Sequence, residues 1–232
     1  MTRVPRHVIG VAAAVVVVAA LFVVLVVAVR AGGGLGYEPA AVRSTTGASI
    51  TLGALPDSMA CHGAGGGPHP EWVSYCPSTS IKVPAYSTVT VTIKQYDTGE
   101  ALHNPFFARV RGTVGGLMFL NGKPVSQISP DQVAHTFTIQ TPPDENEYPL
   151  FVNIPLPPVA DNAPNAVTIN GSRYPKPNVI VFRFKTGGPG QYVWHCYFPC
   201  GTGLAGSGAG GQSGFGGPMA TTGYMSGTLT VT

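Results

Sequence analysis

The sequence predicts an all-β fold, an antiparallel sandwich or barrel, preceded by one N-terminal transmembrane helix. Glycine and proline are abundant, with 31 and 22 of the 232 residues, and short segments of alternating polar and apolar residues lie between turn residues. No convincing amphipathic helix follows residue 30. Only 10% of the residues are charged and the net charge is +3, without a basic cluster. This composition excludes a coiled coil, a charged disordered chain and a nucleic-acid-binding protein.

Residues 8–29 form an unbroken apolar run, VIGVAAAVVVVAALFVVLVVAV, which carries no charge. At about 1.5 Å per residue, a helix of this length crosses the roughly 30 Å hydrocarbon core of a bilayer. A secretory signal peptide has an apolar core of only about 7–15 residues, so the run is too long for one, although AGGG at 31–34 imitates a cleavage site. We therefore expect an uncleaved, single-span anchor.

Basic residues set the expected orientation of this anchor. Arg3 and Arg6 precede the run, which places residues 1–7 in the cytoplasm by the positive-inside bias. Residues 30–48 have the composition of a linker. Residues 49–232 are then an extracytoplasmic domain, and the expected location is the cell membrane, as a single-pass protein.

Two of the four cysteines, Cys61 and Cys76, bracket a loop rich in glycine and proline. An extracytoplasmic domain permits disulfides, so we expect these two residues to close the loop covalently. The alternative is a metal site in which His62 and His69 complete the ligand set. A glycine-rich loop does not fix ligand geometry, which favours the disulfide.

The rest of the chain is predicted to form short strands separated by Gly, Pro and Asn turns. Residues 141–178, rich in Pro and Asn, are expected to be a long excursion over one end of the sandwich. Residues 201–217 are a low-complexity, glycine-rich segment. The expected strands, each with period-two alternation or β-branched and aromatic composition, are 89–94, 135–139, 178–184, 191–196 and 227–232.

The end of the chain resembles that of cupredoxins, the small copper-binding Greek-key sandwiches. In that family, a Pro-Gly turn leads into a Tyr-x-aromatic-x-Cys strand and then a ligand loop that ends in Met before the last strand. An upstream segment, VAHTFTI at 133–139, resembles the one that holds the first histidine ligand of the family. The matching residues here are Pro189, Gly190, Tyr192, Trp194, Cys196 and Met225, with His135 upstream.

This resemblance implies a copper site and one-electron transfer, as in plastocyanin-like proteins and subunit II of haem–copper oxidases. Copper in such a site takes a thiolate, imidazole nitrogen and a weak thioether, which Cys196, His135 and Met225 can supply. Strand alternation directs Cys196 into the sandwich with Tyr192 and Trp194. The second histidine of single-copper cupredoxins is absent, because no histidine follows His195.

Several residues are candidates for the missing ligand. Cys200 gives the spacing C-x-x-x-C-G, which resembles the two-copper site of oxidase subunit II. Met219 would make a sulfur-rich site that favours Cu(I). His195 is a weaker candidate because alternation directs it away from Cys196. His103, in ALHN, is another weak candidate, with a loop cap or a surface histidine as the simpler interpretation.

Two classes of function follow. The first is a membrane-anchored copper protein that transfers electrons, or a redox subunit, with a partner in a respiratory chain; this is favoured over a stand-alone enzyme. The second is a metal-free accessory or interaction module in which Cys196 and Cys200 form a disulfide. A copper chaperone or sensor is intermediate, and is favoured if Met219 and Met225 both bind the metal. In the metal-free case His135 is a buried structural histidine.

Overall fold

A computed structural model describes residues 45–46, 48–57, 61, 69–99, 101–142, 147–198 and 217–232. The chain divides into two compact units, Met1–Glu38 and Pro39–Thr232, and every described residue belongs to the second. The expected anchor at 8–29 and most of the glycine-rich segment at 201–217 lie outside the described residues. Among the helices of the described part, none has the length and apolar character needed to cross a membrane.

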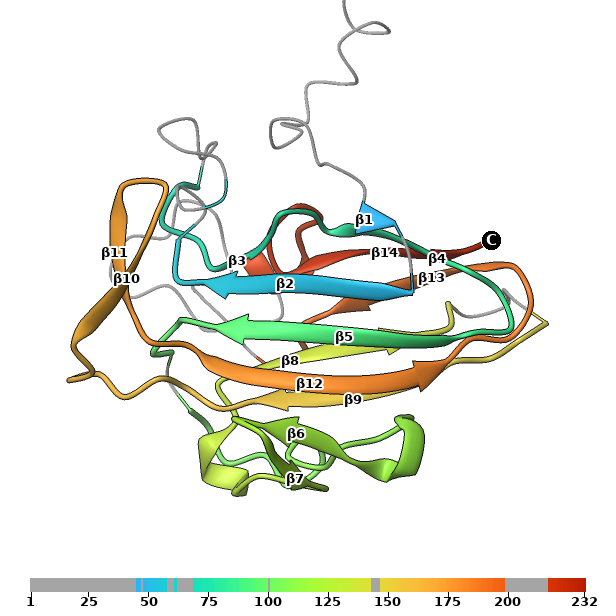
Figure 1. The fold of residues 1–232 in the computed structure, drawn as a ribbon, viewed down its shortest axis with the longest axis horizontal. Coiled ribbons are helices and arrows are strands. Elements are labelled where there is room, and N and C mark those ends of the chain that lie inside the picture. The colour runs from blue at the N-terminus through green and yellow to red at the C-terminus, as the bar shows by residue number, and fades with distance from the viewer. Residues whose placement is uncertain are drawn as a thin grey trace, which may run out of the picture. The chain divides into compact units, whose positions relative to one another are not determined.

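The described residues form a β-sandwich of two six-stranded sheets (Figure 1). The first sheet has the order β1-β4-β14-β13-β8-β9, and the second has the order β3-β2-β5-β12-β6-β7. In the first sheet the strands are β1 (Thr45–Thr46), β4 (Ser80–Val83), β8 (His135–Gln140), β9 (Phe151–Leu156), β13 (Gly190–His195) and β14 (Ser226–Val231). In the second they are β2 (Ser49–Leu55), β3 (Ser74–Cys76), β5 (Thr88–Gln95), β6 (Met118–Leu120), β7 (Lys123–Val125) and β12 (Asn178–Lys185).

A separate two-stranded hairpin lies at one end of the sandwich (Figure 1). It pairs β10 (Asn165–Ile169) with β11 (Ser172–Pro175), and the turn between them places Asn170 and Gly171 at positive φ. Three short 3-10 helices complete the described elements: η2 (Val114–Gly116), η3 (Pro130–Gln132) and η4 (Gly217–Ala220).

The prediction of a β-sandwich is confirmed, and the five expected strands correspond to β5, β8, β12, β13 and β14. Pairing is mixed rather than purely antiparallel, because β2 runs parallel to β5 and β14 runs parallel to β4. The reason is that the chain changes sheets between these strands: β4 belongs to the first sheet and β2 and β5 to the second. A parallel pair needs such a crossover, whereas a tight hairpin reverses the strand direction.

The expected excursion at 141–178 is wrong in its first half. Residues 151–156 form β9, which pairs in register with all of β8 at the edge of the first sheet. The segment FVNIPL tolerates Pro155 because an edge strand does not need every backbone N–H for the ladder. Asn153, at the centre of β9, is fully buried and makes hydrogen bonds described below.

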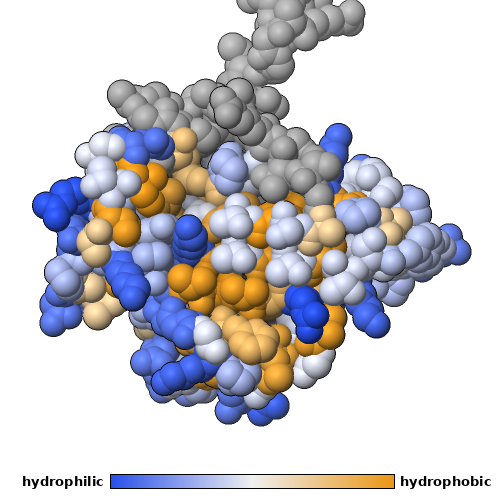
Figure 2. All heavy atoms as spheres, viewed as in Figure 1, coloured by the Kyte–Doolittle hydropathy of each residue, from blue (hydrophilic) through white to orange (hydrophobic). Residues whose placement is uncertain are grey.

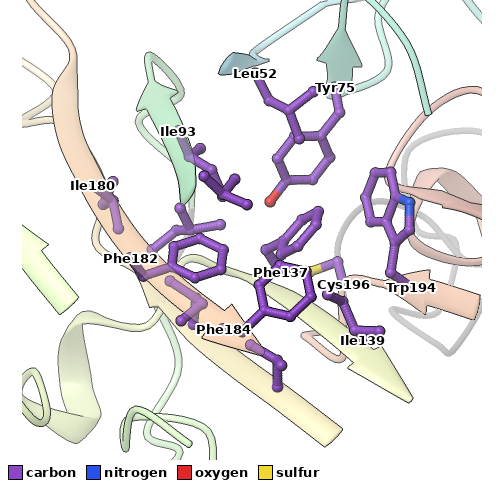
Figure 3. Packing of buried hydrophobic residues seen from close by; sticks show 14 of the residues in the cluster. Leu52, Tyr75, Ile93, Phe137, Ile139, Ile180, Phe182, Phe184, Trp194 and Cys196 are labelled. Atoms are coloured by element: carbon purple, nitrogen blue, oxygen red, sulfur yellow. The ribbon is translucent and has the colours of Figure 1, made fainter. Parts of the chain in front are cut away.

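The core lies between the two sheets, where each contributes its apolar face (Figure 3). Phe137 of β8 packs against Trp194 of β13, with ring centroids 4.7 Å apart, and against Phe182 of β12 at 6.0 Å. The Trp194 indole N–H donates to the Thr79 carbonyl oxygen at 3.1 Å. On the face seen in Figure 2, polar residues occupy the margin and apolar residues gather toward the centre.

The disulfide between Cys61 and Cys76 is confirmed, with a Cα–Cα distance of 5.5 Å. Because this bond uses both sulfurs, they do not serve as thiolate ligands, and the alternative of a metal site in this loop is wrong. His69 instead stacks on the Trp72 ring, with centroids 3.7 Å apart. His62 lies outside the described residues.

Candidate metal centre

Cys196 lies immediately after β13 and is fully buried, as strand alternation predicts. Figure 3 shows its sulfur directed into the packed interior beside Phe137. Two backbone N–H groups, of Thr136 and Phe198, donate to this sulfur at 3.4 Å each. As a thiol, the group can donate to the Phe198 carbonyl oxygen at 3.5 Å. Backbone donors stabilise negative charge on sulfur, and the thiolate is the form that binds metals.

His135, the first residue of β8, lies beside Cys196 and is buried with only 3% of its surface exposed. Its side chain interacts with the Cys196 side chain and with Asp97, whose Oδ2 is 2.6 Å from Nε2 of the imidazole. Asp97 follows β5 by two residues, and sequence reasoning did not identify it. The structure therefore brings together two of the predicted ligands and an unpredicted carboxylate.

The ionisation of His135 reflects opposing effects. Burial on its own lowers the pKa of His135, because it penalises the charged imidazolium. The hydrogen bonds to Asp97 and Cys196, and the negative charges of both groups, outweigh burial and raise the pKa of His135 to about 9. In the metal-free protein at neutral pH the ring therefore carries a proton that a metal ion displaces on binding.

Gly99 closes the turn over the His135–Asp97 pair. It has a φ of +43°, which favours glycine, and a Cβ at this position would lie 3.0 Å from Asp97 Oδ2 and 3.1 Å from His135 Nε2. A side chain here would press on both bonded atoms. Gly99 therefore packs against the bonded atoms of Asp97 and His135 in a space that is tight for any larger residue.

Met225, directly before β14, adjoins Cys196 through the backbone, because the Cys196 N–H donates to the Met225 carbonyl oxygen at 2.9 Å. Its side chain is fully buried and belongs to the same core cluster as Cys196. Met219, in η4, is buried in that cluster as well. The Met225 N–H donates to the Pro218 carbonyl oxygen at 2.9 Å, which joins the two methionine-bearing segments.

The two weaker histidine candidates lie elsewhere. His195, the last residue of β13, is half-buried, and its ring lies 3.9 Å from that of Tyr197 between centroids. His103 is exposed, and its Nδ1 is 2.6 Å from Asp131 Oδ1. The structure thus places His103 as a surface histidine. Cys200 lies outside the described residues, and its roles as a ligand or as a disulfide partner of Cys196 stay predictions.

A buried polar network supports the outer face of the Cys196 segment. The Tyr197 N–H donates to Thr136 Oγ1 at 2.8 Å, and the Thr136 and Thr138 hydroxyls lie 3.0 Å apart. The Thr138 hydroxyl donates to Asn153 Oδ1 at 2.8 Å. The Asn153 amide then donates to two backbone carbonyls of the 104–111 loop, and Phe107 of that loop stacks on Tyr197 with centroids 5.2 Å apart. Both faces of β8 are therefore buried, whereas the alternation of polar and apolar residues in its sequence predicts one exposed face.

The donor chemistry fits a copper ion. Within the described residues, no group of three or more His, Cys, Asp and Glu side chains is arranged to hold a metal ion. A single-copper cupredoxin site takes two histidines and one cysteine, with a methionine thioether as the weak ligand. The described residues provide one histidine and one cysteine of that set, His135 and Cys196, and the same core cluster holds buried Met219 and Met225. Cys196, His135 and the two buried methionines offer soft sulfur and imidazole donors inside a dry core, the chemistry that selects copper.

No protein-family model matches this sequence, and no curated protein sequence matches it. Solved structures that resemble the chain include two auracyanins and rusticyanin. The copper protein rusticyanin is 15% identical, with 82% of each chain covered and a TM-score of 0.37. Dithionite-reduced auracyanin from the photosynthetic bacterium Roseiflexus castenholzii is 14% identical, over 80% of this chain and 97% of its own, at a TM-score of 0.30. Auracyanin B is 18% identical over 85% of this chain and 92% of its own, at a TM-score of 0.29. All three TM-scores are below 0.5.

Proposed function

We propose that this protein is a membrane-anchored, extracytoplasmic copper protein of cupredoxin-like fold that carries single electrons. The observation that supports this most directly is the buried Cys196 sulfur, which receives two backbone N–H donors and adjoins the buried His135. Copper bound there supplies a one-electron Cu(II)/Cu(I) couple. The protein's own residues hold the ligands in fixed positions and exclude water.

Each ligand has a defined part in this proposal. Cys196 is the thiolate and His135 the imidazole, while Met225 is the thioether supplied from the start of the last strand. Cys200 is the proposed fourth donor, which would make the centre similar to that of an oxidase subunit II. The apolar run at 8–29 is the proposed anchor, and a component of a respiratory chain is the proposed redox partner.

The experiment uses the full chain, purified in detergent and loaded with Cu(II). The expected result is an intense visible absorption from thiolate-to-copper charge transfer, lost in Cys196→Ser. Met225→Leu should shift the band or the reduction potential while copper stays bound, because a thioether is a weak ligand. Met118→Leu is the matched control, since Met118 is equally buried but lies in β6 of the other sheet.

Absence of the band contradicts the copper proposal. Thiol titration of the unfolded protein then identifies the alternative. Four cysteines with one disulfide between Cys61 and Cys76 leave two thiols, and a titre of zero means that Cys196 and Cys200 are bonded to one another. That result would make the domain a metal-free accessory module.

A copper chaperone or sensor is a second candidate, supported by the burial of both Met219 and Met225 in the Cys196 cluster. A site with these two thioethers favours Cu(I). It predicts that Met219→Leu weakens Cu(I) binding as much as Met225→Leu does. An electron carrier predicts instead that Met225→Leu alone shifts the absorption band or the reduction potential, and that Met219→Leu leaves both unchanged.

A further inference from the structure

We propose that Asp97 is a positioning residue of the copper centre: its carboxylate holds the His135 ring through Nε2 and thereby reserves Nδ1 for the metal. This inference rests on the proposed function and deepens it. It concerns a residue of the turn after β5, far in sequence from the segments that carry the ligands.

The geometry of the pair determines which ring nitrogen is available. Asp97 Oδ2 lies 2.6 Å from His135 Nε2, and an ionised carboxylate offers only lone pairs. Nε2 therefore carries the proton of this bond. The other ring nitrogen, Nδ1, is then the one that can bind a metal beside Cys196, with whose side chain the ring also interacts. Fixing a ligand histidine through its distal N–H is the usual way in which an outer partner orients the ring and raises its basicity.

The backbone around Asp97 is anchored in a way that suits this role. The Asp97 carbonyl oxygen accepts from the Val159 N–H at 3.0 Å and from the Gln95 side-chain amide at 3.1 Å. Gly99 then packs against both bonded atoms, as described above. Asp97 as a whole residue is only 7% exposed. Burying an unpaired carboxylate is unfavourable, so the position of the Asp97 side chain depends on its bond to the His135 imidazole.

The chain contains a second pair with the same chemistry and the opposite environment. His103 Nδ1 and Asp131 Oδ1 are also 2.6 Å apart, but both side chains are largely exposed. Asp131 therefore provides a matched control in which a carboxylate is removed from a histidine that has no contact with Cys196 in the described structure. Any effect of lost net charge alone appears equally in Asp131→Asn.

Two substitutions separate the orientation of the ring from the charge beside it. Asp97→Ala removes both, and we expect Cu(II) affinity to fall roughly ten- to hundredfold, the usual cost of losing an outer partner of a metal ligand. Asp97→Asn keeps the size and an oxygen that can accept the Nε2 proton. It should retain affinity within a few-fold but raise the reduction potential, because a nearby negative charge stabilises Cu(II) more than Cu(I).

The test measures Cu(II) and Cu(I) affinities by chelator competition, and the reduction potential, on the full chain in detergent. Asp131→Asn should match wild type in each measurement. A merely structural role for Asp97 would lower the free energy of unfolding without changing the potential of the folded Asn variant. If Asp97→Ala does not fold, long-range ¹H–¹⁵N spectra of Cu(I)-loaded wild type and Asp97→Asn replace it, with a proton expected on His135 Nε2.

The outcomes distinguish this inference from the proposed function. Wild type that binds no copper refutes the proposed function and, with it, this role. Wild type that binds copper while both Asp97 variants keep its affinity and potential overturns the role of Asp97 alone. A proton on Nδ1 in the Cu(I) form, or an equal effect of Asp131→Asn, also overturns it.

Discussion

Asn153→Ala is expected to destabilise the domain strongly, although the residue lies on an edge strand. Its side chain makes three hydrogen bonds in a fully buried position: two to the carbonyl oxygens of Phe107 and Arg109, at 3.0 and 2.8 Å, and one from the Thr138 hydroxyl at 2.8 Å. Each hydrogen bond contributes about 1 kcal/mol net, and the substitution removes from the two carbonyl oxygens and the hydroxyl the bonds that they make to Asn153. The expected loss is about 3 kcal/mol in the free energy of unfolding, or roughly 6–12 °C in Tm for a domain of this size.

The assay is urea unfolding followed by tryptophan fluorescence, which reports on Trp72 and the fully buried Trp194, with a thermal scan by circular dichroism. Asn165→Ala is the matched control, because Asn165 is exposed on β10 and its side chain makes no hydrogen bond that the structure records. It should change the free energy by less than about 0.5 kcal/mol. A loss below about 1 kcal/mol in Asn153→Ala would refute the reasoning, since the network would then contribute little.

Further predictions concern a glycine of the last strand and the titration of His135. Gly227→Ala should destabilise by several-fold more than Gly53→Ala in the same urea assay, because a Cβ at 227 meets the Thr79 carbonyl oxygen whereas one at 53 meets only side chains at ordinary contact distance; equal effects would contradict this. Metal-free wild type should lose stability relative to His135→Gln as pH rises from 6.5 through about 9. The reason is that the pKa of His135 is higher in the folded than in the unfolded protein, so the stabilising proton is lost over this range. The loss is at most about 3 kcal/mol, and stability independent of pH over this window would contradict the Asp97 pairing.

Four of the five strands that sequence reasoning found have one buried face, whereas β8 is buried on both faces but still alternates polar and apolar residues in its sequence, HTFTIQ. In β5 the buried and less buried positions alternate along TVTVTIKQ, and β13 and β14 show the same pattern. β9 was missed because its residues are buried on both faces, which removes the alternation, and because Asn and Pro resemble turn residues. Asn153 is buried there only because loop carbonyls, distant in sequence, accept its amide protons.

The residues of the candidate centre that lie in or next to predicted strands were identified from the sequence. Cys196 and His135 were identified through the resemblance to cupredoxin segments, and strand alternation predicted only that Cys196 faces the interior. Asp97 could not be found in this way, because an aspartate two residues before a glycine at the end of a strand has an ordinary local explanation. Its role depends on a contact with a residue 38 positions away, which only the fold reveals.

The central claim is that Cys196 is a copper ligand, and copper content measures it directly. The full chain, loaded with Cu(II) in detergent and freed of excess metal, is analysed for copper beside Cys196→Ser and Met118→Leu. We expect stoichiometric copper in wild type and in Met118→Leu, and a loss of copper in Cys196→Ser. Wild type without copper, or Cys196→Ser with as much copper as wild type, would contradict it.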